Sequence, residues 1–160
     1  MRLVSGSGPI LSFARAHRLD VLNAVVEELF IPDAVYDDIV VAGRGKPGAA
    51  DVANAAWITR TPLTDLSAAD HFSSRLHIGE RQAIALAMQL RLPILVDEKE
   101  ARKVARSLEI PFLGTLRILS EAKRGGIIAE IRPLVQELAR AGIYLSDVLL
   151  RDFFREIGEP

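Results

Sequence analysis

Acidic side chains stand next to the ends of apolar runs in this sequence. Asp97 and Glu98 come directly after the run Ile94–Val96. Glu80 opens the helical stretch before that run, and Asp38 lies in a helical stretch after an earlier run. In open parallel sheets, ligands bind at the carboxyl ends of strands. Carboxylates gathered there would bind Mg²⁺ or Mn²⁺, which can polarise a phosphodiester and activate an attacking water.

Each of these acids also has a purely structural interpretation. Asp97, with Glu100 three residues later, matches a capping box that would stabilise the next helix by about 1 kcal/mol. Glu80 follows a glycine at a helix start, where an acid complements the helix dipole. Asp38, beside Asp37, fits a solvated helix face. Spacing alone favours these interpretations for each residue taken singly, although one carboxylate can serve both purposes.

Basic and imidazole side chains give weaker signals. Arg102, Lys103 and Arg106 recur at helical spacing, as in a solvated helix face, with a phosphate-contacting patch as the alternative. His71 and His77 flank an irregular segment and fit surface positions. We therefore place the candidate chemistry on the carboxylates.

Composition supports that choice and excludes other chemistries. The 160 residues carry 20 Lys and Arg against 21 Asp and Glu, a net charge of −1, which argues against binding polyanions through bulk positive charge. The absence of cysteine excludes disulfides, thiolate nucleophiles and cysteine-ligated metals. No segment has the pattern of a signal peptide or a membrane span. We expect one soluble, cytoplasmic domain over residues 1–160.

Short apolar runs alternate with stretches of helical period, which is typical of a parallel sheet covered by helices. We expect strands near residues 3–4, 30–31, 57–59, 93–96 and 111–113. The helical period predicts helices from residue 9 and over 18–29, 32–41, 49–56, 80–90, 98–108, 116–123, 134–141 and 146–157. Apolar residues near the C-terminus could pack on the core or on a second subunit: Ile143, Leu145, Val148, Leu149, Phe153 and Phe154.

Several segments, in this order and spacing, resemble the PIN-domain nucleases, and specifically their compact VapC-like toxin branch. The segments that carry the resemblance are Val4–Ile10, Ile31–Asp38, Ile78–Ile84, Leu95–Arg102, Gly114–Leu116 and Ala122–Ile128. No one motif is decisive, but together they span nearly the whole chain.

The resemblance implies a three-layer α/β fold, with a parallel sheet of four or five strands flanked by helices. It implies a Mg²⁺- or Mn²⁺-dependent endoribonuclease of a toxin–antitoxin system, with RNA as substrate, a small antitoxin protein as partner and a homodimeric state. Carried over by position, the catalytic acids are Asp38, Glu80 and Asp97, and the metal ligands are these three and Glu98. Thr115 and Ser7 take supporting roles.

The first-strand motif departs from the family's pattern. Members normally have Ser-Asp-Thr-Ser-Pro, whose Asp is the central metal ligand, whereas this chain has Ser5-Gly6-Ser7-Gly8-Pro9. Gly6 therefore lacks the carboxylate, and Gly8 lacks the later hydroxyl. Three explanations of Gly6 are open. The site has degenerated naturally, the change was acquired during cloning of a toxic nuclease, or the remaining acids retain activity without the first Asp. We expect weak or lost cleavage; the alternative function is a degenerate PIN-like module that binds a protein partner or RNA without cutting it.

Overall fold

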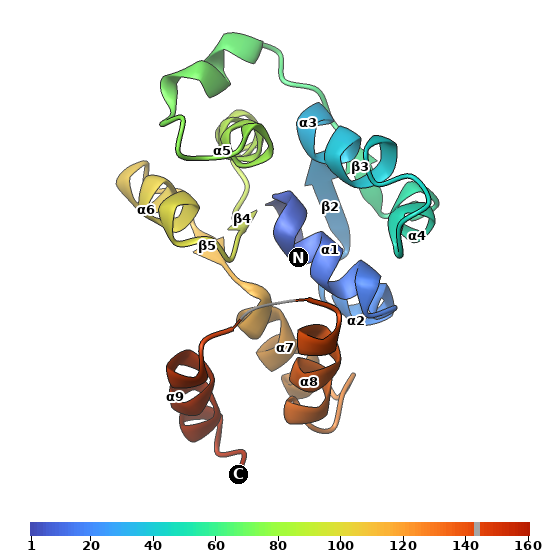
Figure 1. The fold of residues 1–160 in the computed structure, drawn as a ribbon. Helices are drawn as coiled ribbons and strands as arrows, with labels where there is room; N and C mark the ends of the chain where they lie inside the picture. Colours follow the sequence, from blue (N-terminus) through green and yellow to red (C-terminus); the bar gives the residue numbers. More distant parts are fainter. Residues whose placement is uncertain (143–144) are drawn as a thin grey trace.

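The computed structural model describes residues 1–142 and 145–160, which form an α/β fold around one parallel sheet (Figure 1). The five strands lie in the order β3-β2-β1-β4-β5. Their bounds are β1 Arg2–Ser5, β2 Glu28–Ile31, β3 Ile58–Arg60, β4 Ile94–Leu95 and β5 Phe112–Leu113. The predicted fold class, a parallel sheet of four or five strands flanked by helices, is confirmed.

Nine α-helices are assigned in the described residues, together with a π-helical turn at Asp37–Val41 and a 3₁₀ segment at Leu66–His71. The helices are α1 Ser7–Arg15, α2 Leu19–Val25, α3 Asp33–Tyr36, α4 Ala49–Ala53, α5 Ile78–Leu90, α6 Lys99–Ser107, α7 Thr115–Arg124, α8 Arg132–Arg140 and α9 Asp147–Ile157.

The hydrophobic core has two layers, one on each face of the sheet, because successive side chains of a strand point to opposite faces. Leu3 and Leu95 pack with residues of α1, α2 and α7 on one face. Val4 and Ile94 pack with residues of α5 and α6 on the other. The sheet is therefore the middle of three layers, and α5 and α6 lie together on one side of it (Figure 1).

The chain crosses the sheet between β3 and β4, so the strand order changes direction between β1 and β4. Both strands run parallel, with Ser5 opposite Leu95. Gly6 follows β1, and Asp97 follows β4 after one further residue. Ligands of open α/β sheets bind at such switch points, outside the carboxyl ends of the strands. Gly6 and Asp97 therefore stand at the expected ligand-binding position of this fold.

Two helical predictions require correction. The helix expected over 18–29 ends at Val25, because Leu29 belongs to β2 and pairs with Leu3. Leu29 is fully buried in the sheet, and its four- and three-residue spacing from Val25 and Val26 is coincidental. The helix expected over 32–41 changes at Asp37 into the π-helical turn, in which the Ala42 N–H donates to the Asp37 carbonyl five residues earlier.

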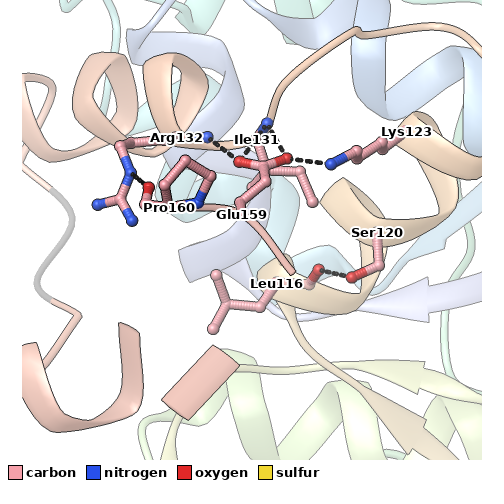
Figure 2. A network of polar contacts seen from close by, with 7 residues as sticks. All are labelled: Leu116, Ser120, Lys123, Ile131, Arg132, Glu159 and Pro160. Carbon is pink, nitrogen blue, oxygen red and sulfur yellow. Dashed lines mark hydrogen bonds and ion pairs between the residues drawn. The ribbon is translucent and has the colours of Figure 1, made fainter. Parts of the chain in front are cut away.

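Helix α9 is fixed to α7 and α8 by a buried carboxylate, as Figure 2 shows. Glu159, whose side chain is 8% exposed, accepts hydrogen bonds from the backbone N–H groups of Ile131 and Arg132 and from the ammonium of Lys123. The Arg132 guanidinium lies 3.9 Å from the centre of the Phe154 ring, and its Nε donates to the Pro160 carbonyl at 2.6 Å. The carboxylate thus satisfies free N–H groups at the start of α8.

The apolar C-terminal residues divide between two environments. Phe154 is buried, and Phe153 packs against the core. Val148 and Leu149, nearer the start of α9, are exposed. Ile143 lies outside the described residues. In the described part of the chain, no helix is long and apolar enough to cross a membrane.

Candidate active site

A small cavity of about 290 Å³ opens where β1 and β4 end. Its lining comes from three segments: the turn after β1, the first turn of α5, and the turn after β4. The lining residues are Gly6, Gly8, Pro9, Glu80, Val96, Asp97 and Glu98. Three of the four expected acids, Glu80, Asp97 and Glu98, therefore meet in one cavity with the position where the family motif has its first Asp.

Asp97 is the most firmly held acid of the cavity. Its Oδ1 accepts a hydrogen bond from the Thr115 N–H at 2.8 Å, and its Oδ2 accepts one from the Thr115 hydroxyl at 2.5 Å. Thr115 is fully buried at the start of α7. The structural interpretation of Asp97 as a helix cap is wrong, because Glu98 occupies the N-cap position of α6 and no side chain caps that helix. Asp97 is oriented by α7 instead.

Arg102 also faces Asp97, from one turn into α6. Its Nη2 lies 3.7 Å from Asp97 Oδ1, and its Nε donates to the Val96 carbonyl at 3.0 Å. A Cβ on Gly114 would collide with the Arg102 guanidinium and would lie 2.7 Å from Asp97 Oδ1. Only glycine leaves room at position 114 for this arrangement.

Glu80 is a partly buried acid with an unsatisfied oxygen. Its Oε2 is buried and has no hydrogen-bond partner among the described residues. Burial raises the pKa of Glu80, and the nearby negative charge of Glu98 raises it further. A carboxylate in this state is poised to gain a proton or a cation.

The backbone does not require glycine at position 6 or position 8. Gly6 has φ −76° and ψ 177°, an extended conformation that any residue adopts. A Cβ on Gly6 would meet its nearest atom, Val96 Cγ1, at 3.8 Å, which is ordinary van der Waals contact. A Cβ on Gly8 would meet nothing within 4 Å. The missing carboxylate and hydroxyl could therefore be accommodated sterically.

Asp38 and Ser7 are not among the residues that line the cavity. Asp38 is exposed in the π-helical turn, which agrees with its interpretation as a solvated side chain. Ser7 is buried at the start of α1, with its hydroxyl oxygen 3.4 Å from the point where a Gly79 side chain would begin.

The donor types suit a hard divalent cation, which prefers carboxylate oxygens and retains several waters. The unpartnered oxygen of Glu80 is the clearest feature that such an ion would satisfy. Within residues 1–142 and 145–160, however, no three Asp, Glu or His side chains come close enough together to hold a metal ion. Glu80, Asp97 and Glu98 fit the ion in chemistry, but they do not form a closely gathered ligand set.

Comparison with known proteins places this fold in a family. Residues 2–159 match the family model described as a PIN domain (DUF3368), and the chain belongs to this PIN-domain family. Among solved structures, it is similar to a PilT N-terminus domain protein from the hyperthermophilic archaeon Sulfolobus solfataricus P2, at 14% sequence identity and a TM-score of 0.57. That similarity covers 76% of this chain and 93% of the other and concerns the fold. Among curated proteins, none matches this chain significantly.

Sequence reasoning missed the role of Arg102 beside Asp97. The segment Leu95–Arg102 and the pair Gly114-Thr115 were both conspicuous, but nothing in the spacing shows that the second motif binds the acid of the first. Arg102 is not a fully solvated side chain, because its Nε donates to the Val96 carbonyl just after β4.

Proposed function

We propose that this PIN domain has the site of a Mg²⁺- or Mn²⁺-dependent endoribonuclease of the toxin–antitoxin type, and that Gly6 leaves its cleavage weak or lost. One observation carries the proposal: Gly6, Glu80, Asp97 and Glu98 line the same cavity at the switch point of the sheet. A nuclease-type fold with carboxylates at this place is suited to phosphodiester hydrolysis.

The residues have distinct proposed roles. Asp97, held by Thr115 and faced by Arg102, presents a fixed carboxylate at the cavity wall. Glu80 supplies an oxygen that has no hydrogen-bond donor in the part of the chain that the structure describes. Glu98, exposed at the start of α6, adds negative charge and can reorient. A divalent cation bound by these groups would supply Lewis-acid activation of the phosphodiester and of a water. Asp38 would join only if the π-helical turn rearranged.

Gly6 is the proposed reason for weak activity. It contributes no side-chain oxygen to the wall beside Val96, so the cavity lacks one negative charge that would help bind a cation. The test is a paired RNase assay of the chain and its Gly6→Asp variant with Mn²⁺, each repeated with EDTA. We expect EDTA-sensitive cleavage by the variant and little by the parent. No cleavage and no metal binding by either protein would contradict the proposal.

The second candidate function is a degenerate module that binds RNA or a protein partner without cleavage. The observation that favours it is Gly8, where a second functional side chain is missing although the space is open. Two losses in one motif fit drift of an unused site better than a single inactivating change. Measurable RNA turnover by the parent chain would remove this candidate.

A small antitoxin protein and a second copy of the chain are the proposed partners, with the cytoplasm as the proposed location. The exposed Val148 on α9 offers apolar surface to a second subunit. Light scattering on the purified chain tests the homodimer, and a mass equal to one chain would contradict it. Co-expression with a small protein encoded beside the gene tests the antitoxin, through co-purification.

A further inference from the structure

A larger groove of about 770 Å³ lies next to the acidic cavity, and Asp97 lines both. We propose that this groove binds the single-stranded RNA that flanks the phosphodiester held in the cavity, with Arg102 and Arg117 contacting its phosphates. The inference rests on the proposed function, because it takes the acidic cavity as the cleavage site. It adds the path that the rest of the strand follows.

The groove borders the acidic cavity at Asp97, the residue that lines both. Asp97, Arg102 and Gly114 lie at its border with the acidic cavity, where the strands end. The groove then follows β5 and the start of α7, and reaches Met1 and Arg2 at the start of β1. A strand with one phosphate in the cavity would thus meet Arg102 next and could continue over the sheet.

The charges along the groove favour an anion. Asp97 is the one carboxylate among the described lining residues, against three arginines. Arg117 is 62% exposed and shares Glu121 with Arg124, so that this group of three keeps a net positive charge. Arg102 is 36% exposed, and its bond to Val96 fixes its position. Its Nη2 faces Asp97 at 3.7 Å, which is longer than a hydrogen bond, so the guanidinium keeps N–H groups for a phosphate. Arg2 is paired with Glu28, so we assign it no phosphate.

The remaining walls are apolar, as nucleobases require. Phe112, Leu116 and Leu149 line the groove, and Leu149 is 47% exposed. Nonspecific sites for single-stranded nucleic acid combine cations that follow the backbone with apolar or aromatic surfaces for the bases. A chain with a net charge of −1 would need such a local arrangement to bind RNA.

The test is binding of a fluorescein-labelled 12-nucleotide oligouridylate to the full chain in EDTA, measured by anisotropy over a range of salt concentrations. Arg102→Gln and Arg117→Gln each should weaken binding about five- to tenfold. Each should also reduce the slope of log affinity against log salt by about 0.7, the value for one lost single-strand phosphate contact. Arg140→Gln is the matched control, because Arg140 is exposed on α8 and does not line the groove.

Arg117→Gln keeps the test decisive if Arg102→Gln disturbs the fold, because Arg117 is largely exposed. The inference is overturned if neither variant changes the affinity, if Arg140→Gln weakens binding equally, or if the parent binds no RNA. It is also overturned if an acidic peptide of the same net charge displaces the RNA at equimolar concentration, which would assign the groove to a protein partner. Cleavage of RNA by Gly6→Asp is measured in a separate assay. Failure of RNA binding in the groove is therefore distinguishable from failure of the proposed nuclease function.

Discussion

Thr115 binds both oxygens of the Asp97 carboxylate, with its backbone N–H at 2.8 Å and its hydroxyl at 2.5 Å. The two residues are far apart in sequence and come together because β4 and β5 are adjacent and parallel. Asp97 follows β4, and Thr115 follows β5, so each stands at the same edge of the sheet. The pairing fixes the orientation of the carboxylate at the cavity wall.

Replacing Thr115 with Val tests this fixation. Valine keeps the shape and removes the hydroxyl, so Asp97 Oδ2 loses its donor while Oδ1 keeps the backbone N–H. Because the lost bond is to a charged group at a buried residue, we expect the free energy of unfolding to fall by about 1–3 kcal/mol. Urea denaturation measures it. Thr115→Ser, which retains the hydroxyl, should lose clearly less; equal losses would show that the hydroxyl does not matter.

Gly114→Ala tests the space occupied by the Arg102 guanidinium. The added methyl group would lie 2.7 Å from Asp97 Oδ1 and would collide with Arg102. Relief requires both side chains to move, at a cost of about 1–3 kcal/mol. Gly8→Ala is the control, since a Cβ there meets nothing within 4 Å. A Gly114→Ala protein as stable as Gly8→Ala would contradict the observed packing.

Glu80→Gln should stabilise the protein at neutral pH. Burial and the charge of Glu98 raise the pKa of Glu80 in the folded chain, so the folded state binds its proton more tightly than the unfolded state does. Protonated Glu80 therefore makes its full contribution to the free energy of unfolding below the ordinary Glu pKa of 4.5. This contribution is lost as pH rises through the higher pKa of Glu80 in the folded chain. The neutral glutamine avoids this loss.

The stability difference between Glu80→Gln and the parent should accordingly grow from acid to neutral pH, as measured by urea denaturation at a series of pH values. Glu130→Gln, at an exposed position, controls for the removal of one negative charge. A difference that shrinks toward neutral pH would show that Glu80 is stabilised in its charged form.

Glu159→Gln should weaken the attachment of α9. Burial raises the pKa of Glu159, but the hydrogen bonds from Lys123, Ile131 and Arg132 outweigh it and hold the pKa below its usual value. The stabilisation is thus present above the ordinary pKa of 4.5 and is lost as pH falls through the folded value. We expect a loss of about 1–3 kcal/mol at pH 7. Glu156→Gln, exposed on the same helix, should change little.

The class of fold could be predicted from the sequence. The strands of a parallel sheet are buried on both faces, so they appear as short apolar runs between helical stretches. It misassigned Leu29, whose spacing fits a helix but whose partner in β1 decides its conformation. Pairing between strands depends on distant residues, which local periodicity does not contain.

The candidate site could be predicted in part, because the apolar runs also show where the strands end. Asp97 and Glu98 lie at a strand end, as the apolar run before them indicated, and Glu80 of the family motif lines the same cavity. Their catalytic and metal-binding roles stay predictions. Asp38 does not line that cavity, and the π-helical turn at Asp37–Val41, where it lies, has no clear signature in the sequence. The contact between Arg102 and Asp97 depends on the gap left by Gly114, which only the three-dimensional packing reveals.

The central claim is that Gly6 leaves incomplete a metal-dependent RNA-cleaving cavity, and it is tested most directly by comparing Gly6→Asp with Gly6→Asn. The two side chains have nearly the same size, and each has a Cβ that would meet Val96 Cγ1 at the ordinary contact distance of 3.8 Å. The measurement is the initial rate of RNA cleavage in Mn²⁺. We predict that Gly6→Asp is faster by on the order of 100-fold, as for an electrostatic contribution to catalysis, and that EDTA abolishes the difference. Equal rates for the two variants in Mn²⁺ would contradict the claim, as would a difference that persists in EDTA.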